Sequence, residues 1–367
     1  MAFSLTQINK KYLDIYNFFC EFNIYRRDED SSYYLDLISV LQALTILYNG
    51  IGNNSKRDLD KELNFEIIPT PMHARAGVFA HENCPMDEHF RDDLRRQDIY
   101  FSNLPKNETQ IEKINKKFKK WPIKKDPFIT KPFLVDHSLY IRTQTLFNGY
   151  WQKPFNKCDT KMDYFYISEN KKILVPMMKN SGVEKLLTYH HDNNNNNHKL
   201  RNCLFVSIPF EKNLYKMLII MSDKASNQRD LLHICTNELE SEDITNFYAN
   251  LGAMTYYKDK IIPKFEFETE WNISLNDDNI KNNCPYINRL LSKTDNLENI
   301  SHRGVELQSS TKIINGEKET RTKAKTEIYK CDSTQKMPTL KINKGFIFMI
   351  LNERNIICSM GIYTGLT

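Results

Sequence analysis

Apolar residues near the start of the chain recur at helical spacing. They stand three or four positions apart at Ile8, Tyr12, Ile15 and Phe19. This spacing predicts an amphipathic helix. A second apolar stretch, residues 38–48, also predicts a helix, and the turn-forming pair Asn49-Gly50 is expected to end it. Residues 75–103 mix apolar and charged positions without one clear period, so mixed structure is predicted there.

Later in the chain the pattern becomes that of strands. β-branched and aromatic residues gather in short runs, some alternating with polar residues and some apolar throughout. Strands are therefore predicted at residues 133–151, 164–166, 173–178, 203–210, 214–221, 261–268 and 346–351. The last run, FIFMIL, is predicted to be buried on both faces. Helices come first in this chain, and strands dominate later.

Residues 190–199 (HHDNNNNNHK) form a low-complexity tract between two predicted strands. Its three histidines suggest a metal site as one interpretation. A polar hairpin loop is the favoured one, because a run of asparagines has no apolar side chains to bury. No metal ligand is therefore assigned.

Composition indicates a globular protein. Hydrophobic residues make up 40% and aromatic residues 12% of the 367 positions, which is enough for a sizeable core. Only 11 glycines and 13 prolines argue against a long flexible linker, although length alone leans toward two domains. Acids and bases are intermixed and the net charge is only +5, so nucleic-acid binding is not expected.

One basic stretch stands out at residues 114–125 (INKKFKKWPIKK). It contains a candidate anion-binding set: Lys116, Lys117, Lys119 and Lys120. A solvated helix face is the favoured interpretation.

Eight cysteines are scattered without a CxxC pair, which predicts free thiols. The chain start lacks a basic segment followed by an apolar one, and no apolar run approaches 18 residues. A cytoplasmic location without membrane contact is therefore expected, with secretion left open. No phosphate-binding loop, nucleophile elbow, zinc-protease helix or dinucleotide fingerprint is present. The chain is accordingly predicted to be neither an enzyme nor a cofactor protein.

Six short blocks, in order, resemble serpin signatures. They are LTILYNGIGNNSKRDL at 44–59, Ile114-Asn115-Lys116, FNGYWQKPF at 147–155, VPMM at 175–178, IPKF at 262–265 and the chain end at 346–361. The segment LTILY, the short connection at 64–72 and the absent signal make the chain similar in particular to intracellular poxvirus serpins of the cytokine response modifier A type. The resemblance covers nearly the whole chain. It implies one α+β domain over residues 1–367, with three β-sheets, about nine helices and an exposed reactive-centre loop near residues 317–342.

The resemblance also implies a function. A serpin is a suicide substrate: cleavage of its loop lets the loop insert as an extra strand into the main sheet and trap the attached protease. The expected partner is a host protease of cysteine or serine type, and a monomer with an anti-apoptotic or anti-inflammatory viral role is implied. The alternative is a non-inhibitory serpin scaffold that binds a partner without trapping a protease.

Whether the first half of this loop can insert as a strand depends on how small and charged residues alternate along it. The hinge starts with Glu317, Lys318, Glu319 and Thr320, where Glu319 replaces the glycine usual in the family. From Thr320 onward one strand face carries small or apolar residues: Thr320, Thr322, Ala324, Thr326 and Ile328. The other face carries Arg321, Lys323, Lys325 and Glu327. Since strand residues point alternately to opposite faces, the first set can be buried while the charges stay in water.

The bait residue follows from the same resemblance. Asp332 lies 12 positions after Thr320 (332 − 320 = 12), the offset of the bait aspartate in cytokine response modifier A. This predicts Asp332-Ser333 as the scissile bond, with Tyr329, Lys330 and Cys331 as recognition residues for a caspase. A granzyme-type serine protease that cuts after aspartate is the alternative. In a shifted register Lys330 or Lys336 would present a trypsin-like bait.

Several departures from the family pattern concern the place where the main sheet opens. Where the family holds Ser-Pro-x-Ser, this chain has Asp36, Leu37 and Ser39. Thr143 stands in place of a family asparagine, and Ser309 or Ser310 in place of a histidine. The resemblance implies that these residues form a hydrogen-bonded sheet-opening cluster. Gly345 also replaces a proline before the last core phenylalanine.

Overall fold

The computed structural model describes residues 4–24, 31–49, 73–81, 88–118, 127–129, 139–147, 149–168, 170–191, 200, 202–223, 227–274, 305–315 and 337–366. The chain divides into two compact units, each assembled from segments far apart in the sequence. Unit 1 takes in Met1–Leu35, Gly149–Thr269 and Lys312–Thr367, and unit 2 takes in Asp36–Asn148 and Glu270–Thr311. The prediction of a single domain over residues 1–367 stays a prediction.

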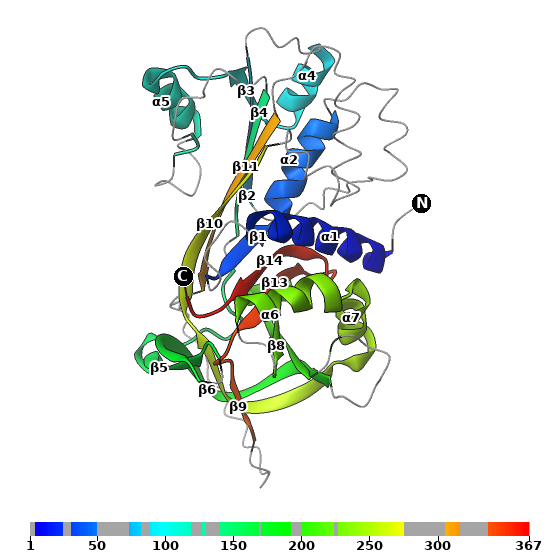
Figure 1. Cartoon of the computed structure of the whole chain (residues 1–367), viewed down its shortest axis with the longest axis vertical. Helices are drawn as coiled ribbons and strands as arrows, with labels where there is room; N and C mark the ends of the chain where they lie inside the picture. The colour runs from blue at the N-terminus through cyan, green and yellow to red at the C-terminus, as the bar shows by residue number, and fades with distance from the viewer. Residues whose placement is uncertain are drawn as a thin grey trace. The chain divides into compact units, whose positions relative to one another are not determined.

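A five-stranded sheet organises unit 2. Its order is β10 (Phe265–Ser274), β11 (Val305–Asn315), β4 (Leu139–Leu146), β2 (His73–Ala80) and β3 (Tyr100–Asn103). Strand β2 pairs antiparallel with β4, whereas β11 and β4 run parallel. Helix α2 (Leu37–Asn49) packs on β4 and β2 (Figure 1), and α4 (Glu88–Arg96) packs beside β3.

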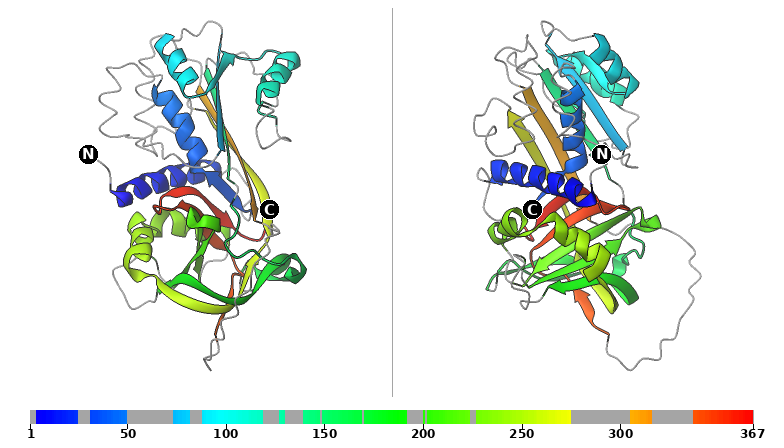
Figure 2. Two further views of the ribbon diagram at one scale, coloured as in Figure 1. Left: turned by 180° about the vertical axis from the view of Figure 1, so that it is seen from behind. Right: turned by 90° about the vertical axis from the view of Figure 1, so that its right-hand side faces the viewer.

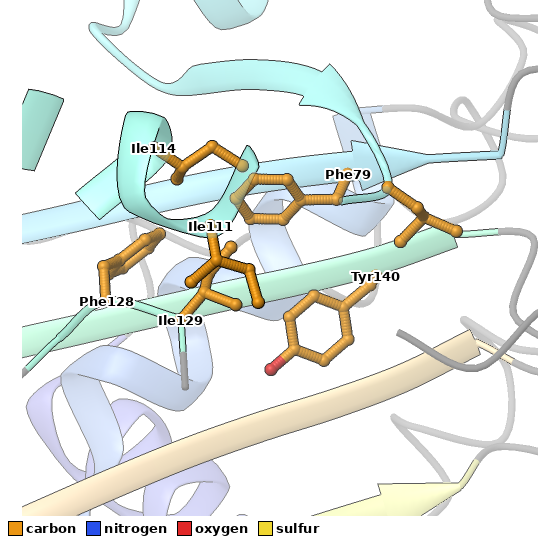
Figure 3. Close-up of a cluster of buried hydrophobic side chains, with 7 residues drawn as sticks. Phe79, Ile111, Ile114, Phe128, Ile129 and Tyr140 are labelled. Carbon is orange, nitrogen blue, oxygen red and sulfur yellow. The ribbon is translucent and has the colours of Figure 1, made fainter. Parts of the chain in front are cut away.

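Helix α5 (Glu108–Lys117) belongs to unit 2 and closes an apolar cluster there. Ile111 and Ile114 point from the helix toward Phe79 of β2 and Tyr140 of β4 (Figure 3). The Asn115 amide holds the adjoining segment in place, because its Nδ2 donates to the Ile129 carbonyl at 2.8 Å and its Oδ1 accepts from the Ile129 N–H at 2.9 Å. The Ile114-Asn115-Lys116 block therefore has a structural role.

Unit 1 holds a nine-stranded sheet with long, curved strands β6 and β9 (Figures 1 and 2). Its order is β1 (Tyr33–Asp36), β14 (Ile357–Tyr363), β13 (Phe346–Asn352), β8 (Tyr215–Ser222), β7 (Cys203–Pro209), β6 (Lys172–His191), β9 (Ala253–Pro263) and β12 (Thr339–Lys341), with β5 (Lys161–Tyr166) paired to β6. Helix α1 (Leu5–Ile24) packs against α7 (Ser241–Asn246) and β14, and α6 (Gln228–His233) also packs against β14.

Strand β6 explains why two hydrogen-bonded sheets are described where three were expected. Its pairing with β9 jumps from Ser181 opposite Asp259 to Glu184 opposite Tyr257, which is a bulge of one residue on β6. Gly182 takes φ +139° there, in the region that favours glycine. Because β6 stays continuous through the bulge, the strands on both sides of it belong to one sheet. The described part has six α-helices, and it leaves the expected number for the whole chain open.

Most predicted elements are confirmed. The two early helices are α1 and α2, and the strand predictions at 203–210, 214–221 and 346–351 match β7, β8 and β13 to within a residue or so. The predictions at 164–166 and 173–178 lie inside the longer strands β5 and β6. The stretch predicted as mixed contains β2, α4 and β3. Strands β6 and β7 pair antiparallel with His191 opposite Cys203, as the hairpin interpretation requires, although residues 192–199 lie outside the described residues.

Two strand predictions were wrong in extent. Strand β4 covers only Leu139–Leu146 of the predicted 133–151; residues 131–138 lie outside the described residues, and Trp151 forms a single bridge to Phe210. The predicted strand at 261–268 is two strands, β9 and β10, separated at Lys264. Pro263 ends β9 because proline has no N–H to donate to a ladder.

The remaining sequence predictions concern sulfur, metal and membrane. The five cysteines in the described ranges, Cys20, Cys158, Cys203, Cys235 and Cys358, are free thiols. Among the described residues no three His, Cys, Asp or Glu side chains gather as metal ligands. None of the helices in that part of the chain is long and apolar enough to cross a membrane.

Candidate functional site

The parallel pair β4 and β11 forms the middle of the five-stranded sheet. Their register runs from Val305 opposite Leu139 to Ser309 opposite Thr143. Parallel neighbours have slanted hydrogen bonds and pair slightly less stably per residue than antiparallel ones. Strand β2 lies on the side of β4 away from β11 and pairs antiparallel with β4. The β4–β11 pair is one of two parallel pairs described in this sheet, and the other is β2 with β3 at its edge.

The first turn of helix α2 is fixed by Asp36. The carboxylate Oδ1 accepts from the backbone N–H of Ile38 at 3.0 Å and of Ser39 at 3.4 Å. These are N–H groups that the helix itself leaves without partners, so Asp36 acts as the N-cap of α2. The cap decides where the helix starts and hence where Ser39 lies.

Ser39 then joins α2 to the sheet. The Thr143 hydroxyl donates to the Ser39 carbonyl at 2.8 Å, and the two hydroxyl oxygens lie 2.9 Å apart. Thr143 has one hydroxyl hydrogen and uses it on that carbonyl, so in the second bond Ser39 donates and Thr143 accepts. Ser39 is 0% and Thr143 1% exposed. Two buried hydrogen bonds thus join Ser39 and Thr143, which lie 104 residues apart in the sequence.

The buried Asp36 carboxyl is electrostatically unusual. Burial raises the pKa of Asp36 to about 7, and the two N–H donors only partly oppose that shift. A carboxyl with a pKa near neutrality is protonated in part at physiological pH. The cluster predicted for sheet opening therefore holds a carboxyl whose pKa lies near neutrality.

Three of the five residues predicted for this cluster are brought together. Asp36, Ser39 and Thr143 form one connected chain of hydrogen bonds. Ser309 lies opposite Thr143 in the register, and Ser310 follows it on β11. The cluster thus stands at the last residue pair of the β4–β11 ladder.

The predicted loop is described only at its two ends. The hinge and bait residues, Glu317, Lys318, Glu319, Thr320, Thr322, Ala324, Thr326, Tyr329, Lys330, Cys331, Asp332 and Ser333, lie outside the described residues. On the N-terminal side the chain leaves the five-stranded sheet at Asn315 of β11, and on the other side it enters the nine-stranded sheet as β12.

The C-terminal end of the loop is anchored by specific contacts within unit 1. Strand β12 pairs parallel with β9, with Leu340 opposite Lys260, and Leu340 is 3% exposed. The Lys258 N–H donates to the Pro338 carbonyl at 3.1 Å. Lys341 Nζ lies 2.7 Å from Asp163 Oδ2 of β5, and this lysine lowers the pKa of Asp163.

A buried ion pair supports the same anchor, and sequence reasoning missed it. Lys260 Nζ lies 2.9 Å from Glu184 Oε2, and the two side chains are 1% and 6% exposed. The Phe155 ring covers Lys260 Nζ at 4.8 Å. No local signal points to this pair, because its partners are 76 residues apart and the ladder brings them together.

The candidate anion-binding lysines are only partly described. Lys116 and Lys117 are exposed in the last turn of α5, and Lys117 Nζ lies 4.8 Å from the Tyr100 ring centre. Lys119 and Lys120 lie outside the described residues. These positions match a solvated helix end, where lysine complements the helix dipole.

Comparison with known proteins points to one family. A family model described as Serpin (serine protease inhibitor) matches residues 69–365. The chain is 31% identical over 111 residues to an alpha-1-antitrypsin-like protein of Tamias sibiricus, covering 29% of this chain and 26% of that protein. It is 26% identical over 228 residues to the human protein Z-dependent protease inhibitor, covering 61% and 45% of the two chains. The chain thus spans about a quarter to half the length of these curated relatives.

Solved structures match over almost the whole length. The mouse protein-Z dependent protease inhibitor superimposes with a TM-score of 0.71, covering 99% of this chain and 98% of that one, at 19% sequence identity. At this identity the likeness shows the fold alone. It confirms the predicted fold class.

Proposed function

This chain belongs to the serpin family, and we propose that it inhibits a protease as a suicide substrate through the loop at residues 317–342. In the proposed reaction the protease nucleophile attacks the Asp332 carbonyl and the Asp332-Ser333 amide bond breaks. The proton goes to the new amino group of Ser333, and an ester or thioester joins Asp332 to the protease. Insertion of the freed loop segment then traps this covalent intermediate.

The observation that carries this proposal is the direct parallel pairing of β4 and β11. A segment that follows β11 and folds back between these strands runs antiparallel to both. Insertion therefore replaces one parallel contact by two antiparallel ones, with a new set of backbone hydrogen bonds. A sheet in which β4 and β11 pair directly would therefore gain backbone hydrogen bonds when the loop inserts.

The alternation of the hinge supports the same proposal. Thr320, Thr322, Ala324 and Thr326 would face one side of an inserted strand, and the charged residues between them would face the other. Burying those charges without partners would cost several kcal/mol each. A register with the small residues buried avoids that cost.

The target is proposed from Asp332. An aspartate at the scissile bond suits a protease whose pocket presents an arginine, which binds a carboxylate with two parallel hydrogen bonds. We therefore propose a host caspase as the target. A granzyme-type protease that also cuts after aspartate is the alternative. A poxvirus-like, anti-apoptotic inhibitor in the cytoplasm of an infected cell is part of this proposal.

One observation favours a second candidate, a serpin scaffold that binds a partner without trapping a protease. Asp36 is a buried carboxyl at the place where the sheet must open, and it is held in a satisfied N-cap. A cluster that stays closed would leave a cleaved loop without a place to insert.

Incubation with caspase-1, caspase-8 or granzyme B separates the two candidates. An inhibitor gives an SDS-stable complex with at least one of them, and mass spectrometry of the released peptide places the cut after Asp332. Asp332→Ala should abolish the complex, whereas Gln335→Ala, in the same loop but outside the predicted recognition residues, should keep it. Cleavage after Asp332 without loss of protease activity would establish the scaffold candidate instead.

A further inference from the structure

Large apolar side chains are exposed on the paired strands β6 and β9 of unit 1, which lie side by side in Figure 1. Val183, Met254 and Tyr256 are 48%, 51% and 50% exposed. Along β9 the exposure alternates, because Met254, Tyr256 and Lys258 are exposed while Tyr257 between them is buried. Strand residues point alternately to opposite faces, so the exposed side chains of β9 share one outward face.

This outward face is also positively charged. Lys185 of β6 pairs with Tyr256 in the ladder, and its Nζ lies 5.2 Å from the centre of the Tyr256 ring. Within residues 181–187 and 253–258 the only acidic residue is Glu184, and it is buried against Lys260. Tyrosine and methionine are enriched in protein interfaces, and lysines favour an acidic partner surface. The loop-side face is defined as Val183, Lys185, Met254, Tyr256 and Lys258.

The direction of the loop brings its bait toward this face. The Lys258 N–H donates to the Pro338 carbonyl at 3.1 Å, and Thr339 lies opposite Asp259. Strands β12 and β9 pair in parallel. Tracing the chain back from Thr339 toward the bait therefore also follows β9 back toward its N-terminal end. The chain at Pro338 thus points toward the end of β9 that carries Tyr256 and Met254.

The distances along the chain are short beside the size of a protease. Ser333 is five residues before Pro338 (338 − 333 = 5), a separation that spans at most about 18 Å. Tyr256 and Met254 stand two and four residues before Lys258, which is about 7 and about 13 Å along the strand. A globular protease of about 250 residues has a radius of gyration of about 18 Å. A protease that holds the bait bond is therefore large enough to contact this face.

We propose that the loop-side face is a second contact surface for the target protease, engaged while the bait bond lies in the active site. This role rests on the proposed function. Asp332 selects only for a pocket that accepts aspartate, and the face adds selection for a protease with an apolar patch and acidic side chains beside its cleft. Tyr256 supplies most of the contact energy, because an exposed tyrosine buries a large area on docking. Lys185 and Lys258 speed association by attracting the acidic surface.

The test measures how fast the loop is consumed. Full-length wild type and Tyr256→Ala are incubated with caspase-1, caspase-8 and granzyme B, and the second-order rate constant for loop cleavage or complex formation is measured. With the protease that consumes the wild-type loop fastest, Tyr256→Ala is expected to react about tenfold more slowly. Its melting temperature should stay within about 2 °C of wild type, because Tyr256 is exposed. Lys258→Ala should make the rate constant less sensitive to salt.

Tyr164 supplies a matched control on the same sheet. It is 46% exposed, and Lys172 Nζ lies 4.0 Å from its ring centre, so it is chemically similar to Tyr256. Tyr164 pairs with Leu174, which is eleven positions before Lys185 on β6 (185 − 174 = 11), or about 35 Å along the strand. Tyr164→Ala should react within about twofold of wild type. An equal loss of rate in Tyr164→Ala and Tyr256→Ala overturns the proposal.

The remaining outcomes separate this surface from the proposed function. An SDS-stable complex that Tyr256→Ala forms at the wild-type rate overturns the surface and leaves inhibition intact. Cleavage after Asp332 without trapping, slowed about tenfold by Tyr256→Ala, supports the surface and refutes inhibition. If none of the three proteases consumes the loop, both the proposed target and this surface are refuted. A dimer in light scattering that Tyr256→Ala abolishes would assign the face to a second copy of the chain and overturn the proposal.

Discussion

The β13–β14 hairpin of unit 1 and the β4–β11 pair of unit 2 are built on opposite principles. Every residue of β13 and β14 is buried, and the two strands pair antiparallel from Phe346 opposite Tyr363 to Leu351 opposite Ile357, with one register shift after Ile350. The β4–β11 ladder is parallel and is held at its last pair by hydroxyl groups and a capped helix. The first region gains its stability from dense apolar packing, which tolerates no rearrangement.

The second region depends on a few directional contacts that break one at a time. Two hydrogen bonds at Thr143 and one N-cap at Asp36 fix the helix to the sheet. A typical hydrogen bond contributes about 1 kcal/mol net, which is small beside the apolar core. The difference teaches how one chain can combine a densely packed core with a strand pair that, in the proposed function, separates to admit the loop.

The largest effect is expected in the permanent core, from Phe348→Ala. Phe348 is 0% exposed, stacks on Tyr34 with ring centres 5.8 Å apart, and lies 5.6 Å from the Phe265 ring. A Cβ on Gly361 would come within 2.6 Å of this ring, so the packing around it is tight. The cavity should lower the free energy of unfolding by about 3–5 kcal/mol, measured by urea denaturation.

Tyr164→Ala is the control for that variant. Tyr164 is 46% exposed on β5, and its removal should change the free energy of unfolding by about 0.5 kcal/mol or less. If the two variants lost the same stability, the contrast between core and surface aromatic residues would be wrong.

An intermediate effect is expected from Thr143→Val. Valine keeps the shape of threonine but removes both hydrogen bonds to Ser39, so the free energy of unfolding should fall by about 1–2 kcal/mol. Exchange of the β4 amides should also become faster at every pH. Thr45→Val is the matched control, because Thr45 Oγ1 donates only to Leu41 within the same helix. Equal acceleration of β4 exchange in the two variants would show that the bond to the sheet has no special part in opening.

The sequence predicted the permanent region well and the opening region only through the family resemblance. Residues 346–351 are apolar throughout, and a run of that kind has few structural alternatives. Ser39 and Thr143 carry no such pattern. They were named because they occupy family positions, and the structure then placed their hydroxyl groups 2.9 Å apart.

Three further features show what could and could not be predicted from the sequence. Asp36 directly precedes a predicted helix, so a capping signal was present, but its burial and raised pKa depend on tertiary packing. Pro263 indicates the break between β9 and β10, although residues 261–268 alternate as one strand would. By contrast, the Lys341–Asp163 contact joins residues with no sequence relation at all.

The smallest effect is expected from Asp163→Asn at the anchor of the loop. The ion pair with Lys341 is short at 2.7 Å, but its side chains are 36% and 39% exposed, so water and salt screen it. Loss of the pair should lower the free energy of unfolding by about 0–1 kcal/mol. Because Lys341 lowers the pKa of Asp163, this contribution is present above the ordinary carboxyl pKa of 3.8 and is lost as pH falls through the lowered value. Urea denaturation at pH 7 in low and in 1 M salt checks this, since the difference from wild type should shrink in high salt. A larger loss than that of Thr143→Val would mean that the anchor of β12, rather than the hydroxyl cluster, is the more important restraint on the loop.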